Sequence, residues 1–305
     1  MNQITEELLK KVSDYKGEFK GAYNIREDGQ CVGRQCSDNI NIVTKGDKPG
    51  IEVHIAPGTK GERVYIPACV TKSYVDDLVY NDFFVGEDAD VIIVAGCGVH
   101  TDNEGEAKHN GVHRFFLSRG SHVLYQEKHL GTGSAKGFRR IDPVTDAYLE
   151  EDSSLEMDTV QLGGVDSTLR KTTAQLADRA KLVVRERILT DGEERAETDF
   201  HVEMNGEDSA VDLVSRSVAK GHSYQEFRSD ILGKNRCSGH SECDAILVDN
   251  GRVHAAPALD AACLDAALIH EAAIGKIAGE QILKLQTLGL AEEEAQEQII
   301  SGFLK

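Results

Sequence analysis

The chain has 305 residues and a formal net charge of −18. A surface this acidic repels phosphate backbones and anionic lipid headgroups, so we expect neither nucleic acid nor a membrane among its partners. No stretch approaches the roughly 20 apolar residues that span a bilayer. The N-terminal residues do not resemble a signal peptide, and seven widely spread cysteines indicate reduced thiols in a cytoplasmic protein.

Residues 1–37 are predicted to form an N-terminal helical segment. Ile4, Leu8, Val12 and Tyr15 recur at helical spacing and form one apolar face. Gly17 follows this face at a position where a helix is expected to end. The expected helix is therefore short.

Residues 38–262 show a different pattern, in which short apolar runs are separated by Gly, Asp and Asn. The chain has 29 glycines but only 5 prolines, as expected for many turns between short strands. Few of the runs have the 3.6-residue period of a helix. This region is predicted to be all-β, either as a sandwich or as a solenoid in which each rung stacks on the last.

Residues 263–305 are predicted to end in two helices joined by a short turn. Gly289 lies where a helix-ending glycine belongs, and three glutamates at 292–294 suit the first turn of the last helix. The apolar positions of the two helices are Ile282, Leu285, Leu288, Ala295, Ile299, Ile300 and Phe303. Such a stripe either packs on its own domain or docks a partner, and the sequence leaves both open.

A first group of potential metal ligands lies in the middle of the chain. Cys97 and His100 are three residues apart, as in many metal sites. His109 and His113 are four apart, so they would share a face of an extended strand. The spacing matches no zinc finger, and residues 101–110 are hydrophilic. We expect either a second metal site at Cys97, His100 and His113 or solvated loop histidines.

A second group of potential ligands comprises Cys237, His240, Cys243, His254, His270 and Glu271. Thiolates suit iron and cluster sulfide. The sequence has no C-x-x-C-x-x-C run that would hold a cluster permanently, so it predicts weak ligation or ligands shared across a dimer. Buried structural cysteine is the alternative. Cys31 and Cys36 are interpreted as ordinary thiols.

Two motifs of nucleotide and acyl chemistry are missing from the sequence. It contains no G-x-x-x-x-G-K-S/T phosphate-binding loop and no G-x-S-x-G nucleophile motif. If the protein works with ATP, a partner chain must bind the nucleotide.

The C-terminal quarter resembles the SufB/SufD family of the SUF iron–sulfur cluster assembly machinery. The residues that carry the resemblance are Ser-Glu-Cys-Asp-Ala-Ile-Leu-Val at 241–248, Ala-Pro-Ala-Leu at 256–259, His-Glu-Ala-Ala-Ile-Gly-Lys-Ile at 270–277 and Gln-Ile-Leu-Lys-Leu at 281–285. The segment at 270–277 is closer to the SufB pattern than to the SufD pattern. Further upstream, Ala-Gly-Cys-Gly-Val-His at 95–100 is similar to short members of the family.

This resemblance implies a right-handed parallel β-helix, expected over residues 38–262, flanked by the short N-terminal helix and a C-terminal helical hairpin. It implies a non-catalytic scaffold subunit, not an enzyme, that assembles a transient iron–sulfur cluster and transfers it to recipient apo iron–sulfur proteins. It also implies a homodimer paired through the β-helix and a partner ATPase of the ABC type, SufC. The expected docking residues for the ATPase are Ile282, Leu285, Ala295, Ile299 and Phe303.

The functional residues that the resemblance implies fall on Cys243, His270 and Glu271. We expect them to meet at the homodimer interface, where a two-fold axis would double each ligand. Adjacent residues on a strand point to opposite faces. His270 or Glu271, rather than both, is therefore expected to ligate the cluster directly.

Two other functions remain open. A structural adaptor similar to SufD would hold the ATPase without binding a cluster. A carbohydrate-active β-helix enzyme would need aromatic side chains for sugar stacking, whereas this chain has no Trp and only 6% aromatic residues.

Overall fold

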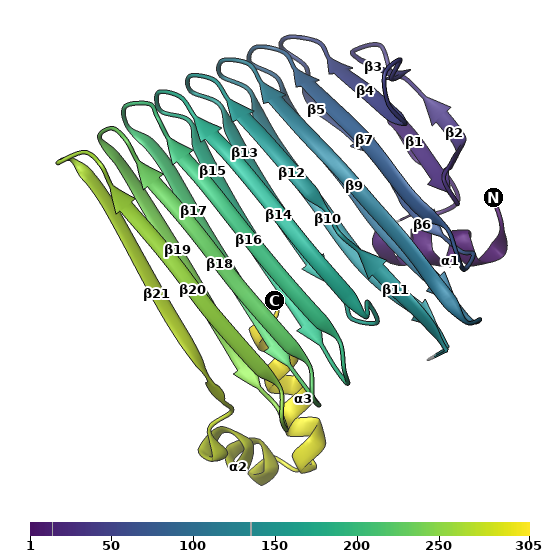
Figure 1. The fold of residues 1–305 in the computed structure, drawn as a ribbon, viewed down its shortest axis with the longest axis vertical. Coiled ribbons are helices and arrows are strands. Elements are labelled where there is room, and N and C mark those ends of the chain that lie inside the picture. The colour runs from purple at the N-terminus through teal and green to yellow at the C-terminus, as the bar shows by residue number, and fades with distance from the viewer. Residues whose placement is uncertain (14, 135) are drawn as a thin grey trace.

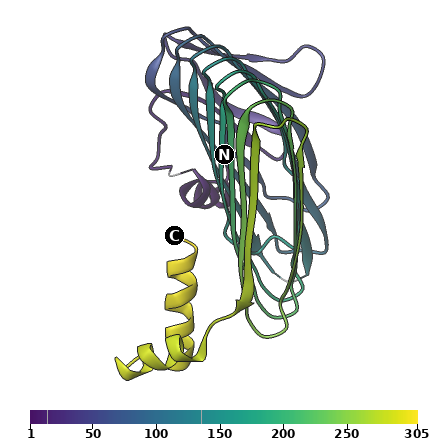
Figure 2. The same ribbon diagram turned by 90° about the vertical axis from the view of Figure 1, so that its left-hand side faces the viewer.

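The computed structural model describes residues 1–13, 15–134 and 136–305. It is mostly β (60%) and forms a β-solenoid of about 8 turns, with a short helix at the N-terminal end and two helices at the C-terminal end. Figure 1 shows the strands stacked side by side along the solenoid, and Figure 2 shows the two sheets as facing walls. The expected β-helix with helical ends is confirmed, and a sandwich is excluded.

Each wall is one continuous sheet. In spatial order, the strands of sheet A are β2 (Gln30–Gln35), β1 (Ala22–Glu27), β5 (Lys60–Tyr65), β8 (Asp90–Thr101), β10 (His122–Gly133), β13 (Ser154–Gln161), β15 (Lys181–Thr190), β17 (Ser209–Ala219), β19 (Cys237–Leu247) and β21 (Ala266–Lys276), with β6 (Ala68–Val70) beside β1 and β8. Those of sheet B are β20 (Arg252–Ala261), β18 (Tyr224–Gly233), β16 (Arg195–Met204), β14 (Ser167–Leu176), β11 (Gly137–Ile141), β9 (Gly105–Leu117), β7 (Asp76–Val85), β4 (Gly50–Ile55) and β3 (Ile40–Thr44), with β12 (Val144–Leu149) beside β9 and β14.

Consecutive strands from β7 to β10 and from β12 to β21 alternate between the two sheets, so that each pairs in parallel with the strand one rung away. The pairs β15–β17 and β17–β19, for example, are in register along their whole length. The first strands differ, because β1–β2 and β3–β4 are antiparallel. This arrangement places residues that are one rung apart in the sequence directly beside each other.

The turns at one end of the rungs explain the abundance of Gly and Asp. Successive turns have a left-handed residue at the same place, including Asp88 (φ 54°), Gly120 (φ 67°) and Asp152 (φ 60°). Gly and Asp adopt this conformation at the lowest cost. The Asp88 N–H donates to the carbonyl of Arg119, and the Gly120 N–H to that of Glu151, at 3.1 and 3.0 Å. The turns are therefore hydrogen-bonded to one another along the solenoid.

The core lies between the two sheets. Along β9 and β15 every second residue is buried, which is the two-residue period of a strand with one face inward. The largest side chains in the core are Phe83, Phe115, Tyr125 and Phe200, all fully buried. Apolar residues fill one side of this interior, and the other side contains a row of polar and charged residues.

The strands extend beyond the expected limits of 38 and 262, because β1 and β2 precede residue 38 and β21 follows residue 262. β1 and β2 have only six residues each, and β2 and β21 contain no fully buried residue, so these strands lack a clear apolar alternation in the sequence. The expected N-terminal helix is present as α1 (Gln3–Val12), which packs on the outer side of β8. Gly96 permits this contact, since a Cβ there would stand 2.4 Å from the carbonyl oxygen of Val12.

The C-terminal hairpin consists of α2 (Gly279–Thr287) and α3 (Glu292–Phe303). It stands beside the end of the solenoid in Figure 2. Ile300 and Phe303 pack against Val218 and Val248, which attaches α3 to the strands of sheet A. In the described part of the chain, no helix has the length and apolarity to cross a membrane.

Candidate functional site

A row of polar side chains runs along the interior of sheet A towards its C-terminal end. The aligned residues, one from each strand, are Glu127 on β10, Thr159 on β13, Glu186 on β15, Ser215 on β17 and Cys243 on β19. All five are at most 3% exposed. Burying so many polar groups is costly unless they are hydrogen-bonded to each other.

Arg170 from sheet B neutralises this row. Its guanidinium lies 2.6 Å from Glu127 Oε2 and 3.3 Å from Glu186 Oε1. Burial disfavours a charged Glu127, but His129 and Arg170 outweigh it and hold the pKa of this carboxyl well below its usual value. Burial raises the pKa of Glu186, although Arg170 opposes the change. The Ser215 hydroxyl donates to Glu186 Oε2 at 2.9 Å, and Ser215 is in turn the register neighbour of Cys243 on β19.

Cys243 lies at the C-terminal end of the polar row. It is 1% exposed, and burial raises the pKa of its thiol to about 12. Its neighbour on β21, the last strand of sheet A, is Ala272. His270 pairs with Ser241, two residues before Cys243, so the imidazole and the thiol are on the same side of the sheet. Within the described residues, His270 Nδ1 is a buried atom with no hydrogen-bond partner.

Glu271 is on the opposite side of β21. It pairs with Glu242 on the outer face of the sheet and is exposed. Within one chain, the structure therefore brings His270, but not Glu271, to the interior side where Cys243 lies. The pleat of β21 causes this difference, because successive side chains of a strand point to opposite faces of the sheet.

The burial of Cys243 predicts a specific order of thiol reactivity. Iodoacetamide attacks thiolates, and a buried thiol with a raised pKa is slow to react. Cys31 and Cys36 are exposed, whereas Cys97 and Cys243 are buried. In the native protein at pH 7.5 we expect alkylation of Cys31 and Cys36 but not of Cys97 or Cys243, as measured by peptide mass spectrometry. Alkylation of Cys243 as fast as that of Cys31 would contradict this placement.

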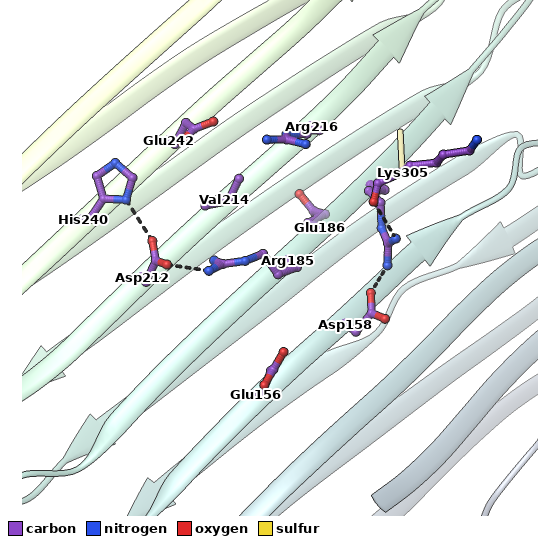
Figure 3. A pocket seen from close by; sticks show the side chains of 11 residues that line it. Glu156, Asp158, Arg185, Glu186, Asp212, Val214, Arg216, His240, Glu242 and Lys305 are labelled. Atoms are coloured by element: carbon purple, nitrogen blue, oxygen red, sulfur yellow. Dashed lines mark hydrogen bonds and ion pairs between the residues drawn. The ribbon is translucent and has the colours of Figure 1, made fainter. Parts of the chain in front are cut away.

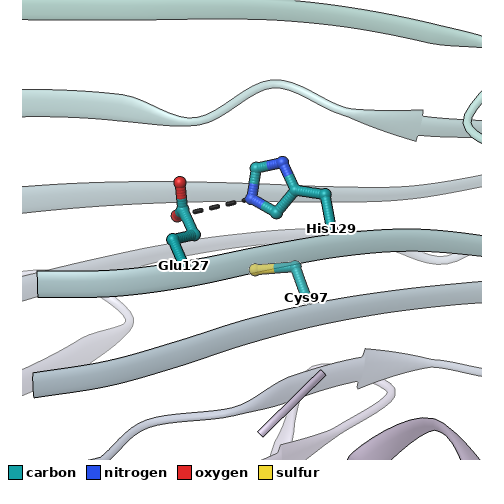
Figure 4. Close-up of side chains that lie close together, drawn as sticks. All are labelled: Cys97, Glu127 and His129. Carbon is teal, nitrogen blue, oxygen red and sulfur yellow. Dashed lines mark ion pairs between the residues drawn. The ribbon is translucent and has the colours of Figure 1, made fainter. Parts of the chain in front are cut away.

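A second concentration of ligand atoms lies deeper in the solenoid. Cys97 on β8 pairs with His129 on β10, and Glu127 is two residues away on the same strand. The ligand atoms of the three side chains lie within 4.8 Å of one another (Figure 4). All three residues are buried. Burial raises the pKa of the Cys97 thiol well above its usual value, so it is protonated at neutral pH.

The structure does not bring Cys97, His100 and His113 together as a metal site, as the sequence had suggested. His100 is three residues from Cys97, so the pleat places it on the outer side of the sheet. Its ring contacts Thr132 Oγ1 at 2.9 Å and Asp102 Oδ2 at 3.1 Å. His113 is in the interior, with its Nδ1 2.6 Å from the Tyr125 hydroxyl. The structure therefore separates His100 from the other two residues.

The outer face of sheet A contains a groove of about 470 Å³ beside the end of α3 (Figure 3). It is lined by Glu156, Asp158, Arg185, Glu186, Arg187, Asp212, Val214, Arg216, His240, Glu242 and Lys305. Several of its charged groups are paired with each other. Asp212, for example, accepts from Arg185 at 2.7 Å and lies 2.8 Å from His240 Nδ1, and Arg187 pairs with Asp158. These pairs link neighbouring strands of the sheet.

The residues expected to bind the ATPase have different positions. Ala295 is buried and Phe303 packs against the solenoid, so this part of the stripe contacts its own domain. Ile282, Leu285 and Ile299 are half-buried. Two other leucines of the hairpin are more available for a partner: Leu283 is 61% exposed and Leu288 is 76% exposed.

Sequence reasoning missed Glu127, Arg170 and Glu186. The alternation of β10 was a usable sequence signal. Tyr125, Glu127 and His129 occupy every second position after the buried Val123, so they face the interior as Val123 does. A charged residue in an inward position of a strand normally indicates a buried partner. The partner, Arg170, is 43 residues away and could not be identified without the fold.

Comparison with known proteins agrees with this architecture. A family model described as "SUF system FeS cluster assembly, SufBD core domain" matches residues 81–303. A protein of Methanothermobacter thermautotrophicus named "Iron-sulfur cluster assembly SufBD family protein" is 28% identical over 266 residues, which are 85% of this chain and 63% of that protein. A protein of the same name from Archaeoglobus fulgidus is 27% identical over 262 residues, 85% of this chain and 69% of that protein.

This chain thus spans less than two thirds of the length of the Methanothermobacter relative. The family model nevertheless covers most of the solenoid and both C-terminal helices. The chain belongs to the SufBD family.

Proposed function

We propose that this protein is a scaffold subunit on which an iron–sulfur cluster is assembled and then passed to recipient apo iron–sulfur proteins. The observation that carries the proposal is the last rung of the solenoid. There, a buried thiol on Cys243 and an unpartnered ring nitrogen on His270 are on the same side of two adjacent strands. The chain has no catalytic role in this proposal.

The chemistry of these two groups suits a transient site. A thiolate and an imidazole are ligands for iron and for cluster iron. The thiol must lose a proton to bind iron, and its raised pKa makes that loss costly. Two ligands from one chain are also fewer than a cluster requires. Both features favour a cluster that is held weakly and can be released.

A second copy of the chain can supply the missing ligands. β21 and β20 are the terminal strands of the two sheets, so their outer edges offer unpaired backbone groups. The apolar side chains exposed on these strands are Leu259, Ile269 and Ile274. We infer that two chains pair end to end through these edges, which would bring two copies of Cys243 and His270 towards one axis.

Anaerobic reconstitution of the purified protein with ferrous iron and sulfide tests the proposal. We expect a cluster detected by visible absorption and Mössbauer spectra, bound to a dimer in sedimentation velocity. Reconstitution without any cluster would instead favour the structural adaptor similar to SufD. A cluster bound to a monomer would contradict the shared site.

We also propose that an ABC-type ATPase similar to SufC docks on the helical hairpin. The sequence has no phosphate-binding loop of its own, and α2 has no buried residue. Leu283 on α2 and Leu288 at its C-cap form an exposed apolar surface, and exposing such a surface to water is unfavourable. A partner that buries them would also hold α2, which has little contact with the solenoid.

The double variant Leu283→Glu with Leu288→Glu should lose co-purification with the ATPase while remaining folded. Charged side chains cannot be buried in an apolar interface without a large desolvation cost. Leu162→Glu is the matched control, because Leu162 is 44% exposed on a different part of the solenoid. Retained co-purification by the double variant would place the docking surface elsewhere.

A further inference from the structure

Two histidines of β9 face each other across a glycine inside the solenoid. His109 and His113 are 1% and 3% exposed, and Gly111 is between them on the same face of the strand. A Cβ on Gly111 would stand 2.7 Å from His113 Nε2 and 3.5 Å from His109 Nε2. Both Nε2 atoms are therefore directed at the space that this glycine leaves open.

Hydrogen bonds determine which nitrogen of His109 holds the proton. His109 Nδ1 lies 3.1 Å from Asp77 Oδ2. Arg26 donates to both oxygens of the same carboxylate at 2.7 and 2.9 Å, so Asp77 is an acceptor. His109 must donate from Nδ1. Neutral His109 thus has a free lone pair on Nε2.

The same reasoning applies to His113 through Tyr125. His113 Nδ1 lies 2.6 Å from the Tyr125 hydroxyl. That hydroxyl donates its only proton to Glu127 Oε1 at 2.8 Å, so its oxygen must accept from His113 Nδ1. The lone pair of neutral His113 is therefore also on Nε2.

Two lone pairs directed at one small space are satisfied by a hydrogen-bond donor or by a cation between them. Among the described residues, neither Nε2 atom has a hydrogen-bond donor, although each Nδ1 is bonded. Each ring is bonded to a carboxylate on its Nδ1 side. His109 contacts Asp77 directly, and His113 is linked to Glu127 through the Tyr125 hydroxyl. Metal-bound histidines typically have this arrangement, because the carboxylate orients the ring and makes it a stronger ligand.

We propose that His109 and His113 form a divalent transition-metal site inside the solenoid, with both Nε2 atoms as ligands and water in the remaining positions. Imidazole is a suitable ligand for zinc, iron, cobalt and nickel. Ferrous iron is the biological ion if the proposed function is right. The site itself does not depend on that function.

The neighbouring group of Cys97, Glu127 and His129 is a weaker candidate for a metal site. His129 Nδ1 lies 3.4 Å from an Arg170 nitrogen, which can only donate. Neutral His129 therefore has its proton on Nε2, which lies 3.3 Å from Glu127 Oε1 but makes no hydrogen bond among the described residues. Both oxygens of Glu127 already accept, from Arg170 and from Tyr125. These lone pairs are used, whereas those of His109 and His113 are free.

Cobalt binding provides the test, because Co²⁺ replaces ferrous iron and has visible d–d absorption. The purified full chain is titrated anaerobically with CoCl₂ alone, without sulfide and without the ATPase, so the outcome is independent of cluster assembly. We expect d–d bands that saturate at one ion per chain. His113→Gln and Gly111→Ala should each weaken this binding at least about tenfold. Gly111 has an ordinary strand φ, so alanine adds only a methyl group in the proposed site.

His201→Gln is the matched control, since His201 is a half-exposed histidine on the outer face of sheet B and should not affect the bands. Unchanged Co²⁺ affinity in both His113→Gln and Gly111→Ala would overturn the proposal, and so would a wild-type chain that binds no Co²⁺. A second measurement does not depend on variants. Nitrogen-15 NMR of the metal-free protein should show both rings protonated at Nδ1, and an Nε2 proton on either ring would also overturn the proposal.

Discussion

Replacing Cys243 with alanine should abolish cluster reconstitution while leaving the solenoid folded. Cys243 is the cysteine of the buried polar row, and its thiol is on the same side of the sheet as His270. Alanine fits the same space and removes one sulfur, which should reduce the free energy of unfolding by about 1 kcal/mol. The measurement is the absorbance of the reconstituted cluster, with circular dichroism to confirm the fold.

Cys31→Ala is the control for this experiment, because Cys31 is an exposed thiol on β2, at the other end of sheet A. It should reconstitute like the wild type. His270→Ala should reduce cluster yield without affecting stability much, since its Nδ1 has no partner to lose among the described residues. If Cys243→Ala still forms a full cluster, the proposed site is wrong and Cys97 becomes the next candidate.

The second large predicted effect is a loss of stability in the variant Arg170→Met. Arg170 is the cation that neutralises the buried carboxylates of Glu127 and Glu186. Methionine has a similar volume but no charge, so Glu127 would be left ionised and unpaired in the interior. Removing one partner of a buried ion pair typically costs about 3–5 kcal/mol. We expect a loss of this size in the free energy of unfolding, measured by urea titration.

Two further variants separate the charge effect from simple loss of packing. Arg179→Met is the matched surface control, because Arg179 pairs with Asp152 but its side chain is 46% exposed. Its effect on the free energy of unfolding should be much smaller than that of Arg170→Met, because water screens an exposed ion pair. Adding Glu127→Gln to Arg170→Met should restore part of the lost stability, since Glu127 then no longer leaves an unpaired charge in the interior. A double variant as unstable as Arg170→Met would show that packing, not charge, explains the loss.

Much of the fold could be predicted from the chain itself. The short apolar runs between Gly and Asp come from a period of two residues and from left-handed turn positions, which are local properties. The helical ends follow from apolar spacing of 3.6 residues and from the glycine at Gly289. Cys243 and His270 could be named because the surrounding residues resemble a family pattern. Each of these features depends on a few residues that are close together in the sequence.

The candidate sites depended on which residues the rungs bring together. Arg170 is paired with Glu127 across 43 residues, and His113 reaches Tyr125 on the opposite sheet. The pleat also decided between neighbours, because it turned His270 inward and Glu271 outward. The sequence by itself determined the strands, the turns, the helical ends and the types of ligand that are available. Only the tertiary structure decided which ligands meet, because contacts between rungs depend on register and on the phase of each strand, and a shift of one residue would reverse every side chain.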